Sequence, residues 1–361
     1  MKPSSFLALS FATASSLTTA ILCTLFAITF LASCAHSGRI AETGAGAESA
    51  SGVQRLYAAS SQQFGAISGI VADTQGNLII ADAGKNCIHK MHLTNGRVRT
   101  LAGGEGTGVA DGSREEAQFF SLTDITMDAK GNFVVIDGQR IRRITPRGVV
   151  TTFAGSLKRG NEDGLGTNAR FNMPVAIAAD DAGNVFVADA GNSSVRRINP
   201  QGRVETLAFK FGTPTHLTFD KQGRLLVLDR TNACVYALSP ETITASQTVA
   251  SQSAAVVVKF ADAGFSYANF SRMTLDNDGN IVLVEEAEKT SVYRINPTGV
   301  VGKVAERPRG EWSCAGMLLH KESGRLLLIN ARDNGFYSVS IAKGMTNSQD
   351  SMTGIIENQA K

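Results

Sequence analysis

Three side chains that could bind a ligand or move a proton occupy the same position of a pattern that recurs along the chain. They are Asp124, His216 and Arg272, and each precedes a glycine by seven residues. A carboxylate, an imidazole and a guanidinium together can hold an anionic or polar ligand, and histidine can act as an acid or base near neutral pH. The remaining copies carry small residues there, namely Gly69, Ala176 and Gly316, the last of them eight residues before its glycine because the sixth copy has one extra residue before its turn. If the copies close into a ring, the three polar side chains converge; the alternative is a solvated channel mouth with incidental polar residues.

A second polar position follows each of these glycines by six residues. Its occupants are Asp82, Asp137, Asp189, Asp229, Glu285 and Asn330. Carboxylates in a ring suit a hard cation. A residue present once in every copy is more simply structural, however, and we expect these side chains to accept backbone N–H bonds in the following loop. Glu285 and Asn330 depart from the repeated Asp in adjacent copies, so we add them to the candidate ligand-binding residues.

Both positions belong to a block that occurs six times, with a short apolar run, a tight turn and a second apolar run. The turn glycines are Gly76, Gly131, Gly183, Gly223, Gly279 and Gly324. In the third copy, short runs rich in β-branched residues predict strands A to D at 175–179, 185–188, 194–198 and 203–207. Gly183 supplies the positive φ that the A–B turn needs. Six such units predict an all-β, six-bladed β-propeller.

The ends of the repeat region predict how this ring closes. The sixth unit has three strands and is followed by a polar tail at 343–361. Residues 52–60 (GVQRLYAAS) match the fourth strand of the second unit. We therefore expect the N-terminal segment to supply the outer strand of the last blade, so that the propeller covers residues 52–342.

The repeats resemble NHL repeats. Copies two and three also carry the preceding loop of that family, as Gly108-x-x-Asp111-Gly112 with Ala117-x-Phe119, and as Gly160-x-x-Asp163-Gly164 with Ala169-x-Phe171. The resemblance implies a six-bladed propeller but no single activity, because relatives include scaffolds, ligand sensors, lyases and lactonases. Lyase relatives hold zinc through several histidines, and only His216 is placed for that. Lactonase relatives hold calcium through a Glu, Asn and Asp set, which Glu285 and Asn330 could join. We expect no cofactor, with calcium as the open alternative.

The N-terminal segment is typical of an export signal. Residues 1–33 hold one charge, Lys2, and an apolar run at 20–31 that is too short to span a membrane. Leu31-Ala32-Ser33-Cys34 resembles the lipobox of bacterial lipoproteins, which implies cleavage before Cys34 and a lipid on its thiol. Ala35 then implies the outer membrane, and residues 34–51 form a small, polar tether. The alternatives are an ordinary signal peptide with a chance cysteine and an uncleaved anchor.

Charge and composition exclude several classes of function. The net charge is +3 over 361 residues, and +2 once Lys2 is removed, which excludes a nucleic-acid role. Hydrophobic residues make up 43% of the chain, which excludes wholesale disorder. Cys87, Cys234 and Cys314 have no evident pairing, and we expect buried thiols. The third strands of copies two and three lie next to an outer edge, so a solvated flank is expected for Arg142, Arg143, Arg196 and Arg197.

Taken together, the sequence predicts a monomeric, lipid-anchored binding or scaffold module of the bacterial cell envelope. It would hold a protein or a small polar ligand through its top face, where the B–C and D–A loops lie, including the long loops 103–118 and 155–170. The alternative is an enzyme of the lyase or lactonase type with its site at the channel mouth.

Overall fold

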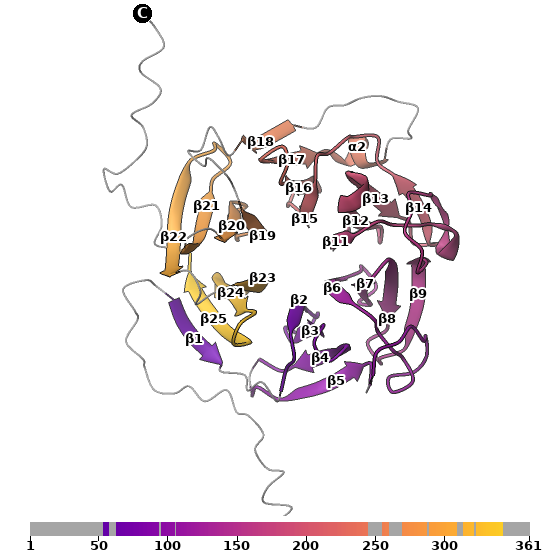
Figure 1. The fold of residues 1–361 in the computed structure, drawn as a ribbon. Coiled ribbons are helices and arrows are strands. Elements are labelled where there is room, and N and C mark those ends of the chain that lie inside the picture. Colours follow the sequence, from indigo (N-terminus) through magenta and orange to yellow (C-terminus); the bar gives the residue numbers. More distant parts are fainter. Residues whose placement is uncertain are drawn as a thin grey trace, which may run out of the picture.

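The structure is a computed structural model that describes residues 53–57, 63–93, 95–104, 106–244, 255–259, 269–286, 289–308, 313–320 and 323–341. Cys34, the predicted signal and tether, and the tail 343–361 lie outside these residues. Within them, six sheets are arranged around a central axis, as Figure 1 shows. The chain is a six-bladed β-propeller, which confirms the predicted fold.

Each blade contains four antiparallel strands, A to D, from the axis outward. Blade 1 is β2 (Ile67–Ala72), β3 (Leu78–Asp82), β4 (Cys87–Met91) and β5 (Val98–Ala102). Blade 2 is β6 (Leu122–Met127), β7 (Phe133–Asp137), β8 (Arg140–Ile144) and β9 (Val150–Gly155). Blade 3 is β11 (Pro174–Ala179), β12 (Val185–Asp189), β13 (Ser194–Ile198) and β14 (Arg203–Thr206), with a short fifth strand, β10 (Gly164–Leu165). The strands predicted for blade 3 are thus correct to within one residue at each end.

The second half of the ring repeats this order. Blade 4 is β15 (Pro214–Phe219), β16 (Leu225–Asp229), β17 (Cys234–Leu238) and β18 (Ala255–Lys259). Blade 5 is β19 (Phe270–Leu275), β20 (Ile281–Glu286), β21 (Lys289–Ile295) and β22 (Val301–Pro308). Blade 6 is β23 (Cys314–His320), β24 (Arg325–Asn330), β25 (Gly335–Ser340) and β1 (Val53–Tyr57). Short helices lie in the connections, namely η1 (Gly166–Asn168), η2 (Ala190–Asn192) and α2 (Pro240–Thr244).

The N-terminal strand closes the ring, as the sequence predicts. β1 pairs antiparallel with β25, and Val53 lies opposite Val339 while Tyr57 lies opposite Phe336. The pairing removes one exposed strand edge and joins the first strand of the propeller to its last. Because β25 runs from the top face to the A–B turns, β1 starts at the face that carries those turns, here called the bottom face.

The A–B turns owe their shape to the repeated glycines and to a local aspartate cap. All six turn glycines have φ between 62° and 83°, in the left-handed region that favours glycine. In blade 3 the Asp180 carboxylate accepts the backbone N–H of Asn184 at 2.7 Å. Similar bonds from Asp73, Asp128, Asp220 and Asp276 occur in the other copies that carry this Asp.

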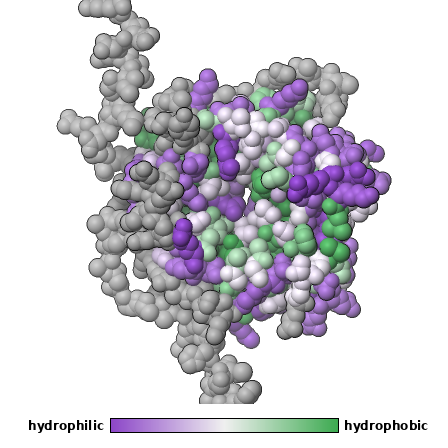
Figure 2. Space-filling view, in the orientation of Figure 1, coloured by the Kyte–Doolittle hydropathy of each residue, from purple (hydrophilic) through white to green (hydrophobic). Residues whose placement is uncertain are grey.

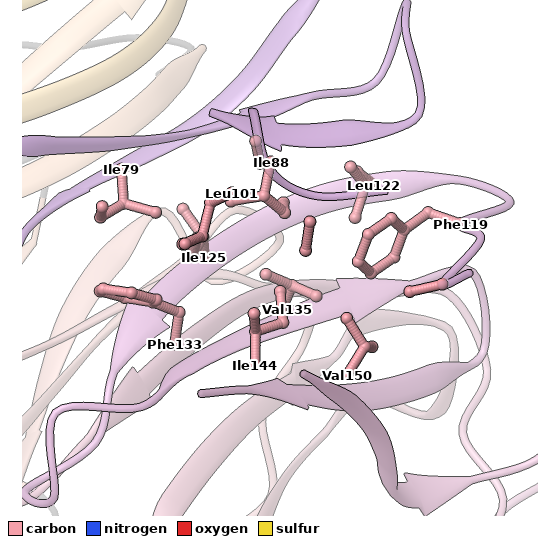
Figure 3. Packing of buried hydrophobic residues seen from close by; sticks show 13 residues of the cluster. Ile79, Ile88, Leu101, Phe119, Leu122, Ile125, Phe133, Val135, Ile144 and Val150 are labelled. Carbon is pink, nitrogen blue, oxygen red and sulfur yellow. The ribbon is translucent and has the colours of Figure 1, made fainter. Parts of the chain in front are cut away.

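The hydrophobic core consists of six clusters, each at a junction between two neighbouring blades. Figure 3 shows the cluster in which Ile79, Ile88 and Leu101 of blade 1 meet side chains of blade 2 such as Phe133. Strand B of the first four blades is buried along its whole length because another blade covers each of its faces. Among the described residues, no helix has the length and apolar character needed to cross a membrane.

Candidate functional site in the axial channel

The inner strands of all six blades surround an axial cavity of about 300 Å³. Figure 2 looks along the ring axis and shows the molecule hollowed at its centre. Asp124, His216 and Arg272 all line this cavity, together with Gly69 and Gly316. The structure therefore brings together the three polar residues that share one repeat position, although they come from blades 2, 4 and 5.

Arg272 reaches across the channel from blade 5. Its Nη2 donates to the backbone oxygens of Ser68 and Ala315, both at 2.8 Å, and its Nη1 lies 3.8 Å from Oδ1 of Asp124. Ser68 belongs to blade 1 and Ala315 to blade 6, so one guanidinium contacts both sides of the junction where the ring closes. Inner strands have an unpaired edge toward the axis, and Arg272 satisfies two of its carbonyls.

Asp124 is held from the opposite side of the channel. Its Oδ2 accepts the backbone N–H of Ile177 at 3.0 Å, and only 6% of the residue is exposed. Burial raises the pKa of Asp124, while Arg272 and this N–H oppose the rise. A side chain at position 69 would crowd the carboxylate, because a Cβ on Gly69 would lie 2.9 Å from Oδ1 of Asp124. The small residue in blade 1 therefore makes room for the acidic one in blade 2.

The imidazole ring of His216 is neutral at pH 7. Burial lowers its pKa to about 3, and the positive charge of Arg272 contributes to the shift. The expectation that His216 titrates near neutral pH is therefore wrong, because a second positive charge in this enclosed channel is unfavourable. Its Nδ1 is buried and has no hydrogen-bond partner among the described residues. A buried polar atom of this kind is costly unless a ligand or water meets it.

The position of the cavity differs from the expected channel mouth at the top face. Its lining begins at the layer of Asp124, His216 and Arg272 and continues along the inner strands toward the A–B turns, through Thr126, Thr218 and Thr274. The three polar residues therefore lie at the end of the cavity nearer the top face, and the cavity extends from them toward the bottom face. Ile70, Ile125, Leu217, Met273 and Met317 also border the cavity, but most of the surface that faces it is polar.

Glu285 and Asn330 are not among the residues that line the cavity. Asn330 ends strand B of blade 6, where its Oδ1 accepts the backbone N–H of Ser313 at 3.0 Å. Glu285 lies opposite Phe270 at the end of β20. Among the described residues, no group of three or more His, Cys, Asp or Glu side chains is arranged to hold a metal ion.

The repeated aspartates at the end of strand B accept backbone N–H groups of the loop before strand A. Asp82 binds the N–H groups of Gly65 and Ala66 at 2.7 and 3.0 Å. Equivalent bonds reach Asp137 from Phe120, Asp189 from Asn172, and Asp229 from Gly212. In these four blades, the carboxylate at the end of strand B holds the start of strand A of the same blade. Its role there is structural.

Comparisons with known proteins agree with this architecture. The NHL repeat family matches residues 171–198, which extend from just before β11 to the end of β13 in blade 3. Virginiamycin B lyase from Staphylococcus aureus is similar with a TM-score of 0.55 and 13% identity, over 80% of this chain and 99% of the lyase chain. A gluconolactonase from Xanthomonas campestris has a TM-score of 0.57 and 14% identity, over 80% and 89%. The fold is an NHL-type β-propeller. At these identities the likeness concerns the fold alone.

A sequence relative covers less of this NHL-type propeller. The protein SUPPRESSOR OF QUENCHING 1, chloroplastic, of Arabidopsis thaliana is 30% identical over 131 residues. The match covers 33% of this chain and 12% of the plant protein.

Two arginines of the NHL-type propeller correct the sequence prediction of a solvated flank. Arg142 and Arg196 are fully buried. Arg196 binds Asp189 at 2.9 Å and Asp163 of the preceding loop at 2.5 Å. Arg142 binds Asp137 and Asp111 in the same way, at 2.8 and 2.7 Å. The long loops fold back over strand C and cover it. The prediction of exposure rested only on the position of strand C next to the outer edge of the blade and did not take these loops into account. The signal was available, because Asp-Gly loops and these arginines occur in the same two copies.

Proposed function

We propose that this propeller is a binding module that holds a small polar ligand in its axial cavity. The observation that carries the proposal is the convergence of Asp124, His216 and Arg272 on one layer of the cavity, where no residue in the described part of the chain pairs with Nδ1 of His216. Buried polar atoms in folded proteins usually have a hydrogen-bond partner. A ligand that forms a hydrogen bond with this nitrogen therefore gains affinity.

The electrostatics favour a ligand without net charge. His216 is neutral at pH 7 because its pKa is about 3. Arg272 and Asp124 are 3.8 Å apart, and their opposite charges balance when both are ionised. A free anion or cation entering this layer would compete with that pair. A mainly polar lining and a volume of about 300 Å³ suit a compact molecule that offers hydroxyl or amide groups.

Ligand-observed NMR with a library of small uncharged and zwitterionic compounds tests the proposal. We expect compounds that bind the wild type and lose binding in His216→Phe and Arg272→Met. Arg224→Ala is the matched control, since Arg224 lies on an A–B turn outside the cavity. If no compound distinguishes the wild type from the two cavity variants, the binding proposal is wrong.

An enzyme with its site in the same cavity is the second candidate. The observation that favours it is the raised pKa of Asp124, since a buried carboxyl of this kind suits general acid or base work. The fold is similar to a gluconolactonase and a lyase. Proton release from gluconolactone is a direct test. Hydrolysis above the uncatalysed rate that disappears in Asp124→Asn would establish this reading, and its absence would dismiss lactonase activity on that probe.

The cellular location of the protein is a separate part of the proposal. The Leu31–Cys34 pattern supports a lipid on Cys34, and Ala35 after it supports attachment to the bacterial outer membrane. Mass spectrometry of the N-terminal peptide should find an acylated Cys34, and Cys34→Ala should move the protein from the detergent phase to the aqueous phase. An unmodified Cys34 would remove the anchor from the proposal and leave the cavity proposal intact.

A further inference from the structure

Four large apolar side chains are exposed on the top side of blades 2 and 3. Val109, Phe120, Leu157 and Met173 are exposed by 41, 57, 61 and 53%. Phe120 and Met173 stand just before the inner strands β6 and β11, and Leu157 follows the end of β9. We call these four residues the blade 2–3 patch. Single exposed apolar residues need no explanation, but a group does.

The four members are grouped because all of their segments contact one turn, Gly138–Arg140. A Cβ on Gly138 would lie 3.5 Å from Cδ1 of Phe120, and the Oε1 of Gln139 accepts the backbone N–H of Met173 at 3.0 Å. Arg140 donates to the backbone oxygen of Val109 at 3.0 Å and pairs in register with Gly155, two residues before Leu157. The patch therefore surrounds the B–C turn of blade 2.

Met173 is held in a strained conformation that keeps it in the patch. Its φ is +53°, in the left-handed region that costs a residue with a Cβ on the order of 1 kcal/mol. Ser121 and Thr213 occupy the equivalent positions of blades 2 and 4, and neither has a positive φ. The hydrogen bond to Gln139 fixes the backbone of Met173, and its side chain remains half in solvent.

The border of the patch carries unbalanced positive charge. Lys158 and Arg159 directly follow Leu157, are exposed and have no ion-pair partner among the described residues. The acids of the same loop are already engaged, because Glu162 pairs with Arg170 and Asp163 pairs with Arg196. An incoming surface that complements this border is acidic.

We propose that the blade 2–3 patch docks a partner protein through an apolar segment flanked by acidic residues. Phe120 and Met173 provide the apolar contact, and Lys158 and Arg159 select the charge of the partner. This surface lies on the top side of the ring, whereas the axial cavity extends toward the bottom face. The docking proposal therefore does not depend on a ligand in the cavity.

The path of the chain favours a protein over a membrane as the occupant. β1 begins at Val53, opposite Val339 near the bottom face, and runs toward the top face. The strand that follows the predicted tether thus starts at the face opposite the patch, which leaves the patch open to a partner protein.

The experiment uses the mature chain and a phage library of short random peptides as the probe. We expect selected peptides to combine large apolar residues with Asp or Glu. For a synthesised selected peptide, the double variant Phe120→Ser, Met173→Ser should raise Kd about tenfold or more. Lys158→Glu with Arg159→Glu should weaken binding in a salt-dependent way.

Two controls make the result specific. Val300→Ser removes an equally exposed apolar side chain from blade 5 and should leave peptide binding unchanged. Arg272→Met should also leave it unchanged, so that failure of the cavity proposal does not affect this one. The proposal is overturned if no selected peptide depends on the patch, or if those that do lack acidic residues. Cosedimentation with phosphatidylethanolamine–phosphatidylglycerol vesicles that is lost in the Lys158→Glu, Arg159→Glu variant would overturn it in favour of a membrane.

Discussion

Blades 2 and 3 differ from blades 4 to 6 in how the middle of strand C is held. The residue of strand C that pairs with the middle of strand B is Arg142 in blade 2 and Arg196 in blade 3. In blades 4, 5 and 6 it is Tyr236, Tyr293 and Tyr337. The arginines are fully buried and each bridges an aspartate of strand B to an aspartate of the long loop.

The tyrosine blades lack that bridge, and the large polar side chains of the channel come from the same half of the ring. His216 belongs to blade 4 and Arg272 to blade 5. Arg272 binds carbonyls of blades 6 and 1 and approaches Asp124 of blade 2. Blades 2 and 3 are thus stabilised by ion pairs under their top loops, whereas Arg272 of blade 5 connects to the inner strands of blades 6, 1 and 2 at the centre of the ring. Four measurements test this comparison.

Arg196→Met should produce the largest effect. It leaves Asp189, which is fully buried, without its cation, and removing one partner of a buried ion pair costs about 3–5 kcal/mol of unfolding free energy. Urea denaturation measures the change. Arg197→Met is the control on the next residue, because its pair with Glu205 is partly exposed and contributes less than about 1 kcal/mol. Equal losses in the two variants would refute the special role of the buried arginine.

Arg272→Met should lower the unfolding free energy by about 1–3 kcal/mol, because two partly buried carbonyls lose their donor. A second readout identifies the cause. The pKa of His216 should rise from about 3 when the positive charge of Arg272 is removed. NMR titration of the imidazole follows this change, and an unmoved pKa would show that Arg272 does not act on the ring.

The pH dependence of stability should reveal His216. Its folded-state pKa of about 3 lies below the usual 6.5, so the unfolded chain binds the extra proton first. The contribution is complete above pH 6.5 and is lost as the pH falls toward 3, with a slope of up to about 1.4 kcal/mol per pH unit. Asp124, whose pKa is raised, contributes the opposite slope, because its stabilising effect is lost as the pH rises through its folded-state pKa. The difference between wild type and His216→Gln isolates the histidine, and parallel curves would contradict the lowered pKa.

Tyr337→Phe should have the smallest effect. It removes one hydrogen bond, from the tyrosine hydroxyl to Oδ2 of Asp333 at 2.7 Å, which contributes about 1 kcal/mol. Thermal unfolding should therefore change far less than in Arg196→Met. A comparable loss in both would mean that the two halves of the ring are stabilised to the same extent at this position.

Much of the fold could be predicted because its determinants are local. A turn glycine repeats at every A–B hairpin, in five of the six with a local aspartate, and counting the glycines counts the blades. Each blade needs four strands, but the sequence after residue 341 does not read as a strand, whereas residues 53–57 do. These two local patterns together predict that the N-terminal segment closes the ring. The shared position of Asp124, His216 and Arg272 also follows from the repeat alone.

The tertiary structure alone decided what surrounds those positions. Arg142 and Arg196 are buried because a loop distant in sequence covers them. The local sequence around each arginine does not predict this burial. The neutral state of His216 depends on burial and on Arg272 from another blade. The extension of the cavity toward the bottom face depends on side chains from all six inner strands. Hydrogen bonds within a turn are set by neighbouring residues, whereas burial and electrostatic potential are sums over the whole ring, and only the closed ring determines them.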